Sequence, residues 1–502
     1  MAITDPPLTL LPDPRPLIGD QRIPNASGGE YEHRYAATGR PTKLVPLGAE
    51  REMDAAVHAA RHALPHWRAL PANQRRDMML RLCQLVKENA EQLARLQTIE
   101  NAVPRMFASR FPEAAVDYLA YNAGWIDKIG GEVVTTWPTR AIDFTLDEPY
   151  GVVAVIIPWN APLPSLGQVL GPALAAGNTV VVKPPELAPF TALRVGELVL
   201  ESGFPPGVVN VVPAGPVGGN ALVRHPGIDK IHFTGSAETA KKILAGALEN
   251  LTPVGLELGG KSALLVFSDA DLLAAGRQAV GAAIVLSGQG CTNSTRLLVE
   301  RPVYDRLIRI VKGLMKHTVV GDPCDDRTFM GPVVSAAACD RILGVITQAR
   351  ESGSGRLAVG GERLGGELAA GYFISPTLFL DVDNNSDLAQ NEIFGPVVAA
   401  MSFDTEEQAI QLANDTRYGL AAYVYTNDLS RAYRVSQELI TGNVWINGFD
   451  GIPPSAPFGG TKQSGYGRIG GIAGIREFTR PKNLWMSIRE RAANTPNESS
   501  AL

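Results

Sequence analysis

The stretch Val-Val-Ala-Val-Ile-Ile at residues 152–157 is the first of a series of short apolar runs, and this series decides the fold. The later runs are rich in β-branched residues and occupy 179–182, 208–212, 230–233 and 262–267. Segments with helical spacing separate them, such as 192–202 and 237–248. Buried parallel strands in βαβ units produce this alternation, because helices cover both faces of such a sheet. The sequence therefore predicts a doubly wound, Rossmann-like α/β domain.

The chain is too long for this domain alone. A length of 502 residues exceeds what one hydrophobic core usually serves, so two or three domains are expected. Residues 50–130 have the spacing of helices, and a second α/β region is expected from about 270 to 460. Apolar and polar residues alternate at 141–148 and at 484–488, which predicts edge strands that need a partner.

Composition and charge exclude several classes of function. The net charge is only −5 and no basic patch is present, so no nucleic-acid partner is expected. No apolar stretch approaches the ~20 residues that a membrane span needs, and the Pro-rich residues 1–20 do not resemble a signal peptide. Seven scattered histidines and four distant cysteines show no metal-ligand spacing. We therefore expect a cytoplasmic protein without a metal site or membrane partner.

Cys291 and Glu257 are the strongest candidates for chemistry. Cys291 follows Gly-Gln-Gly, a turn that can leave a thiol open to a substrate, and Glu257 stands 34 positions earlier in the segment LELGGK. Covalent catalysis by a thiol needs a nucleophile and a base, and this pair could supply both. The alternative is that Cys291 is a buried, inert thiol. The other cysteines lack this setting, because Cys83 and Cys339 fit helical packing and Cys324 stands beside two carboxylates.

Polar and Gly-rich loops follow the apolar runs. They are Pro158-Trp159-Asn160, Lys183 to Glu186, Gly215 to Gly219, and Thr234-Gly235-Ser236. Ligands of open parallel sheets bind where such strands end. A Lys and a Glu three positions apart can reach ribose hydroxyls, and a Gly-Ser turn that opens a helix can meet a phosphate. The loops predict a nucleotide-sized cleft, although turn chemistry alone would explain any one of them and no regular G-x-G-x-x-G is present.

Seven segments, in order and with matching spacing, resemble the aldehyde dehydrogenase superfamily over about residues 20–490. They are PWN at 158–160, KPPE at 183–186, FTGS at 233–236, LELGGK at 256–261, GQGC at 288–291, EIFGPV at 392–397, and PFGG with KQSG at 457–465. The resemblance implies an oxidoreductase that converts an aldehyde to the carboxylic acid with NAD, and less readily with NADP. The reaction would pass through a cysteine thiohemiacetal and a thioester.

The resemblance also implies a role for each matching residue. Cys291 would attack the aldehyde, Asn160 and the Cys291 N–H would hold the oxyanion, and Glu257 would activate the hydrolytic water. Lys183 and Glu186 would bind the adenosine ribose, Ser236 the pyrophosphate, and Glu392 with Phe394 the nicotinamide riboside. Further cofactor contacts would come from Ile156, Pro158, Trp159, Gly215, Gly219, Phe233, Gly235 and Leu258.

The expected architecture has three parts. The NAD-binding domain would comprise 1–130 and 150–259, and the catalytic domain 260–460. A small β oligomerisation element would comprise 131–149 and 461–490, which suggests a homodimer or homotetramer. Residues 491–502 would form a disordered, polar tail.

Several positions depart from what the family usually has. They are Ala161, Ser165, Gln168, Val169, Leu286 and Ile469. The first three replace aromatic or bulky residues of the substrate tunnel, which predicts a wider or more polar tunnel.

Three alternatives remain. A coenzyme A-acylating semialdehyde dehydrogenase would use a thiol in place of water, but such members commonly lack the carboxylate at Glu257. A cofactor-free thiol hydrolase would need a histidine beside Cys291, and the sequence marks none. A non-catalytic protein with the same fold would be expected to have lost Cys291 or Glu257.

Overall fold

Five parallel strands form the centre of the first sheet in the computed structural model, which describes residue 3 and residues 5–488. They are β7 (Val152–Ile156), β8 (Thr179–Lys183), β9 (Val209–Val211), β10 (Lys230–Gly235) and β11 (Val254–Leu258). Their order is β11-β10-β7-β8-β9, and antiparallel strands β1 (Leu17–Ile18), β2 (Gln21–Arg22) and β19 (Gly465–Tyr466) extend the sheet to eight. The tail predicted at 491–502 lies outside the described residues.

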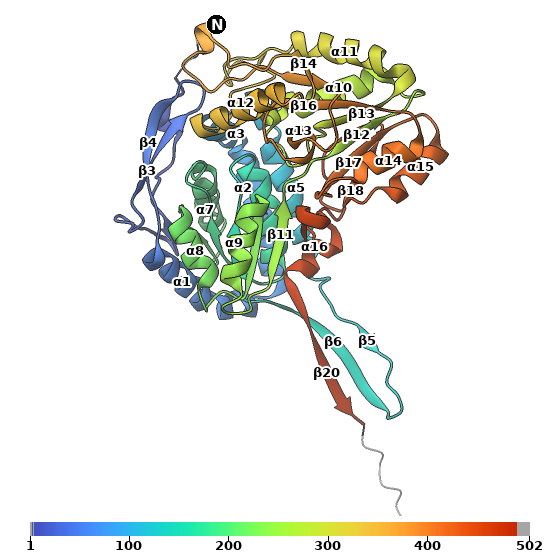
Figure 1. Cartoon of the computed structure of the whole chain (residues 1–502). Coiled ribbons are helices and arrows are strands. Elements are labelled where there is room, and N and C mark those ends of the chain that lie inside the picture. Colours follow the sequence, from blue (N-terminus) through green and yellow to red (C-terminus); the bar gives the residue numbers. More distant parts are fainter. Residues whose placement is uncertain (1–2, 4, 489–502) are drawn as a thin grey trace, which may run out of the picture.

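Helices cover both faces of this sheet, as the doubly wound fold requires. Successive residues of β7 enter different cores, with Val153 and Val155 in one and Val152 and Ala154 in the other. The first core adds α2 (Ala72–Glu88), α3 (Ala90–Asn101), α5 (Phe111–Ala123), α6 (Pro162–Ala175) and α7 (Phe190–Glu201). The second adds α1 (Glu50–Ala69), α8 (Pro216–Arg224) and α9 (Ala237–Ala247) (Figure 1). The predicted fold class is confirmed.

The second sheet has seven strands in the order β14-β15-β16-β13-β12-β17-β18, all parallel except β14. They are β12 (Ala263–Val266), β13 (Arg296–Glu300), β14 (Arg356–Val359), β15 (Thr377–Leu380), β16 (Val397–Phe403), β17 (Ala421–Tyr425) and β18 (Asn443–Ile446). Its helices are α10 (Leu272–Ile284), α11 (Tyr304–Lys316), α12 (Ala336–Glu351), α14 (Glu406–Asn414) and α15 (Leu429–Glu438). The fifth apolar run, 262–267, therefore belongs to this sheet and not to the first.

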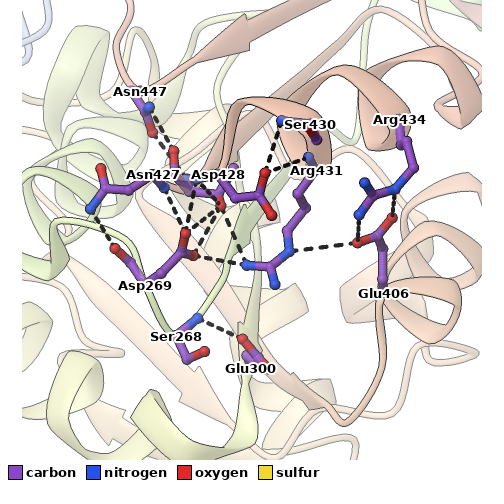
Figure 2. Close-up of polar contacts among 11 residues, drawn as sticks. Ser268, Asp269, Glu300, Glu406, Asn427, Asp428, Ser430, Arg431, Arg434 and Asn447 are labelled. Carbon is purple, nitrogen blue, oxygen red and sulfur yellow. Dashed lines mark hydrogen bonds and ion pairs between the residues drawn. The ribbon is translucent and has the colours of Figure 1, made fainter.

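Asp269 joins the carboxyl ends of β12 and β17. Its carboxylate accepts hydrogen bonds from the Thr426 hydroxyl at 2.8 Å, the N–H groups of Asn427 and Asp428 at 2.9 and 3.0 Å, and the Arg431 guanidinium at 2.9 Å (Figure 2). A carboxylate with several such donors is a strong anchor. Because the strands are parallel, this anchor lies at the edge of the sheet away from Cys291, which precedes the start of β13, and its role is structural.

The segments predicted as edge strands are partners of each other. Strands β6 (Ala141–Pro149) and β20 (Thr479–Ser487) pair antiparallel along nine residues, and β5 (Val133–Val134) adds a third strand. This sheet projects from the body of the molecule as an arm (Figure 1). Large apolar side chains remain exposed along it: Val133, Trp137, Ile142, Leu146, Trp485 and Met486. Within residues 3 and 5–488, no helix has both the length and the apolarity to cross a membrane.

Candidate active site

The parallel strands of the first sheet bring the predicted ligand loops to one edge. Trp159 and Asn160 follow β7, Lys183 ends β8, Gly215 follows β9, and Ser236 follows β10. Lys183 is 9% exposed, and burial lowers the pKa of its ammonium, opposed by Glu186. Three other predicted cofactor residues, Ile156, Phe233 and Leu258, lie mostly beneath this edge in the core.

Two helices begin side by side at this edge. Helix α8 starts at Gly215, where no side chain caps the free N–H groups of the first turn. Helix α9 is capped by Ser236, whose hydroxyl accepts from the Thr239 N–H at 3.2 Å. Gly219 lies one turn into α8. A Cβ built on it would be 3.7 Å from the Lys183 Cε, so the start of α8 and the Lys183 side chain lie next to each other. Uncapped N–H groups beside a cation fit a diphosphate, and Glu186 at the same edge fits ribose hydroxyls.

Glu257 is a buried carboxylate without a partner. It is 4% exposed, and neither oxygen accepts a hydrogen bond from the described residues. Burial raises its pKa well above the usual value, Arg468 opposes this shift, and Glu477 adds to it. A carboxylate left without donors in a dry site is a stronger base than one in water.

A strained turn places Cys291 beside this carboxylate. Helix α10 ends in a 3-10 turn in which Leu286 and Ser287 have positive φ of 51° and 54°. Gly288 follows at φ 75°, and a Cβ there would overlap the Gly395 carbonyl. Such backbone is costly for residues other than glycine, so packing against the 392–396 segment must hold it.

The Cys291 thiol lies in apolar surroundings. It packs with a small cluster formed by Leu420, Phe458 and Ile469. Burial raises its pKa to about 12, Glu392 and Glu257 add to this, and the N–H groups of Cys291 and Thr292 oppose it. Those N–H groups therefore face the sulfur. No histidine is among the groups that most affect this pKa in the described part of the chain, whereas a thiol–histidine hydrolase would require one beside the sulfur.

Asn160 is tied to the same turn. Its amide Nδ2 donates to the Gln289 carbonyl at 2.8 Å, two residues before the cysteine. Asn101, from the end of α3, donates to the backbone carbonyls of Trp159 and Asn160 at 2.9 and 3.2 Å. The Gln289 side chain accepts from the Val334 N–H at 3.0 Å. Asn101 and Gln289 were not among the predicted site residues, because only their contacts across the chain reveal their roles.

Glu392 and Phe394 reach over from the second sheet. The Glu392 carboxylate accepts from the Gly260 N–H at 3.2 Å, and burial raises its pKa to about 7. The Phe394 ring meets the Trp159 ring edge to face, with centroids 5.4 Å apart. Nearby, Lys261 is buried with no partner for its ammonium among the described atoms, and burial lowers its pKa to about 7. Glu392 and Phe394 of the second sheet thus contact Gly260 and Trp159, next to the loops of the first sheet.

A metal site and a covalent active site with a bound nucleotide can be compared with this geometry. No group of three or more His, Cys, Asp or Glu side chains is arranged to hold a metal ion in the part of the chain that the structure describes. The convergence of a thiol, an amide and a carboxylate, beside two helix N-termini, is instead suited to covalent chemistry with a bound nucleotide.

Comparison with known proteins gives a consistent result. A model of the aldehyde dehydrogenase family matches residues 23–484. Mitochondrial aldehyde dehydrogenase of Homo sapiens is 40% identical over 463 residues, 91% of this chain and 88% of that protein. Cytosolic aldehyde dehydrogenase 1 of Mus musculus is 40% identical over 455 residues, 89% of each. The crystal structure of betaine aldehyde dehydrogenase from Staphylococcus aureus in complex with NAD+ superimposes with a TM-score of 0.94 at 34% identity, covering 97% of both chains.

Proposed function

This chain belongs to the aldehyde dehydrogenase family, and we propose that it oxidises an aldehyde to the carboxylic acid with NAD, by way of a thioester on Cys291. The observation that carries the proposal is the unpartnered Glu257 carboxylate, which lies close enough to Cys291 to raise the pKa of its thiol. A dry base beside a cysteine suits hydrolysis of a thioester.

The chain's own groups can perform each step. The Cys291 thiol loses its proton to solvent as its sulfur bonds to the aldehyde carbon, and the negative oxygen that forms is stabilised by the Asn160 amide and the Cys291 N–H. Loss of hydride from this tetrahedral carbon leaves the thioester, which water attacks while Glu257 takes its proton; the C–S bond then breaks, which releases the acid, and the Cys291 sulfur takes up a proton again. When bound, NAD supplies the acceptor for the hydride. Lys183, Glu186, the starts of α8 and α9, and the Glu392–Phe394 segment would hold it.

Asn160→Ala should lower kcat by about 10²–10³-fold, the usual cost of losing one oxyanion donor. NAD affinity should change little, because the Asn160 amide bonds to the Gln289 carbonyl and not to the cofactor loops. Steady-state kinetics together with NAD titration of the free protein would measure both. A raised KM for NAD with an unchanged kcat would instead place Asn160 in the cofactor site.

NAD should be preferred to NADP by roughly 10-fold or more in kcat/KM, because Glu186 would face the 2′-phosphate with like charge. Lys183 nearby softens the penalty, so preference and not exclusion is expected. Glu186→Ala should narrow the ratio while leaving kcat with NAD nearly unchanged. A wild-type kcat/KM that is higher with NADP would refute the assignment.

A panel of aldehydes, assayed for NADH with and without coenzyme A, tests the proposed reaction itself. Oxidation without coenzyme A supports hydrolysis by water. NADH formation that depends on coenzyme A would favour the acylating alternative, and turnover of an ester without NAD would favour the thiol hydrolase. The presence of Glu257 argues against the acylating reaction, since a thiol nucleophile needs no dry base to activate water.

We propose that the arm formed by β5, β6 and β20 is an oligomerisation element and that the protein is at least a dimer. Its exposed Trp137, Trp485 and Met486 would otherwise remain in water. Light scattering at micromolar concentration should give at least twice the mass of one chain, and a monomer would contradict this. We also propose domain limits at 130, 149, 259 and 460, and a cytoplasmic location. The named relatives include one mitochondrial and one cytosolic protein.

A further inference from the structure

A second carboxylate, that of Glu477, lies on the same face of the first sheet as Glu257. Glu477 is the last residue of α16 (Gly471–Glu477). A Cβ built on Gly255 would overlap its Oε1, and one on Gly467 would lie 2.8 Å from its Oε2. Glu477 therefore occupies the space of a side chain at position 255. Because β11 side chains two residues apart share a face, this carboxylate is the neighbour of Glu257, roughly 7 Å along the strand.

The space around both carboxylates is bordered by glycines. A Cβ on Gly459 would lie 2.8 Å from the Glu257 Oε1, just as Gly255 and Gly467 adjoin Glu477. Neither Gly255 nor Gly459 has positive φ, so the backbone does not demand glycine there. At Gly255 the Glu477 carboxylate excludes a methyl group, and at Gly459 the Gly467 carbonyl at 2.7 Å excludes one together with the Glu257 Oε1. One water joins oxygens at most about 5.6 Å apart, so a separation of this size needs a chain of two bridging waters.

Lys230 holds Glu477 in place. Its ammonium donates to the Glu477 Oε1 at 2.6 Å and lies 5.2 Å from the centre of the Tyr150 ring. The Glu477 side chain is 13% exposed, whereas the residue Glu257 is 4% exposed. Glu477 is therefore nearer to solvent than the base, and its ion pair stabilises its negative charge.

The other titratable groups around the two carboxylates are few. Arg468, Tyr118 and Cys291 interact electrostatically with Glu257. Tyr466 and Lys230 do so with Glu477. His232 lies across from Gly255 in the sheet and is buried, and its pKa of about 3, lowered by burial and by Lys230, keeps it neutral.

We propose that Glu477, positioned by Lys230, receives the proton that Glu257 takes from the hydrolytic water and passes it to solvent. The proposal rests on the proposed role of Glu257 as base. An O–H bond of the attacking water breaks and an O–H bond forms on Glu257. That proton then moves along two bridging waters to Glu477 and out, which restores the Glu257 carboxylate, and no electrons are transferred. Glu477 touches no reacting atom, so it is a positioning residue that acts through Glu257.

Glu477→Gln in the full chain tests this. The first turnover should still give a burst of NADH of wild-type rate and amplitude, because hydride loss precedes hydrolysis. The acyl-enzyme should then decay roughly 10–100-fold more slowly than in the wild type, which is part of the usual contribution of positioned proton transfer. Quenching at set times and intact-mass analysis measure this decay. Raising the imidazole concentration at constant pH and ionic strength should restore the rate, because a small buffer can carry the proton in place of Glu477.

Glu197→Gln is the matched control. Glu197 is also ion-paired, with Arg194 at 3.0 Å, but on α7. The acyl-enzyme of this variant should decay at the wild-type rate, and imidazole should not change that rate. If Glu477→Gln does not fold because Lys230 is left unpaired, Lys230→Met with Glu477→Gln removes both charges and should show the same buffer dependence.

The outcomes separate the two proposals. The role of Glu477 is overturned if the acyl-enzyme of Glu477→Gln decays at the wild-type rate. It is also overturned if the acyl-enzyme decays slowly and imidazole does not raise the rate. Glu257→Gln, measured in parallel, tests the base alone, and its acyl-enzyme should persist whatever Glu477 does. If the acyl-enzyme of Glu257→Gln decays at the wild-type rate, the proposed function is overturned, and Glu477 then has no proton to accept from Glu257.

Discussion

Cys291→Ala should reduce aldehyde oxidation by about 10⁴-fold or more, since loss of a covalent nucleophile removes the pathway and not only one interaction. Alanine fits where the thiol packs against Leu420, Phe458 and Ile469, so the fold should persist. NAD affinity should stay near that of the wild type, because the proposed phosphate and ribose contacts come from other loops. Turnover and NAD titration measure the two effects separately.

Cys339→Ala is a suitable control for Cys291→Ala. Cys339 is buried in α12 and packs in the core of the second sheet, so it should be dispensable for turnover. Residual activity of Cys291→Ala within about 10-fold of the wild type would remove Cys291 from the mechanism.

Glu257→Gln should lower steady-state turnover by about 10²–10⁴-fold, the usual contribution of a positioned base. The amide cannot take a proton, so the thioester should accumulate. Rapid mixing with NAD and a good aldehyde should then give a burst of NADH near one equivalent per site, and intact mass should show an acyl adduct on Cys291. Absence of both burst and adduct would mean that Glu257 also deprotonates the thiol before attack.

The pH dependence follows from the same burial. Glu257 works as a base only when ionised, and its pKa is raised well above the ordinary value. Hydrolysis should therefore decline as pH falls through this raised pKa, at a higher pH than an exposed carboxyl would give. Acyl-enzyme decay measured across pH would show this limb. A rate that stays constant down to the pKa of an ordinary glutamate would contradict the burial argument.

The apolar runs predicted the parallel strands well, because burial on both faces leaves an unmistakable pattern. The loops after them lie at one edge of the sheet, since parallel strands end at the same edge. The run 262–267 belongs to the same series of apolar runs, but its strand lies in the second sheet, in line with the expected start of the catalytic domain at 260. The apolar run itself does not encode its neighbours. Asn101, Lys261 and Glu477 escaped prediction for a related reason, since their importance lies in contacts between distant segments.

The state of the thiol could not be read from the sequence either. A cysteine after Gly-Gln-Gly suggests an open and reactive group, whereas burial and two carboxylates keep it protonated. Only the folded chain brings Glu257 and Glu392 to it, from positions 34 residues before and 101 residues after.

The protonated thiol has a consequence for chemical durability. Peroxides and alkylating agents react with thiolates and hardly with thiols. Because burial raises its pKa to about 12, Cys291 is mostly a thiol at neutral pH. The resting protein should therefore withstand oxidants that would inactivate a cysteine with a low pKa, and its nucleophile becomes vulnerable only when the thiol loses its proton for the reaction.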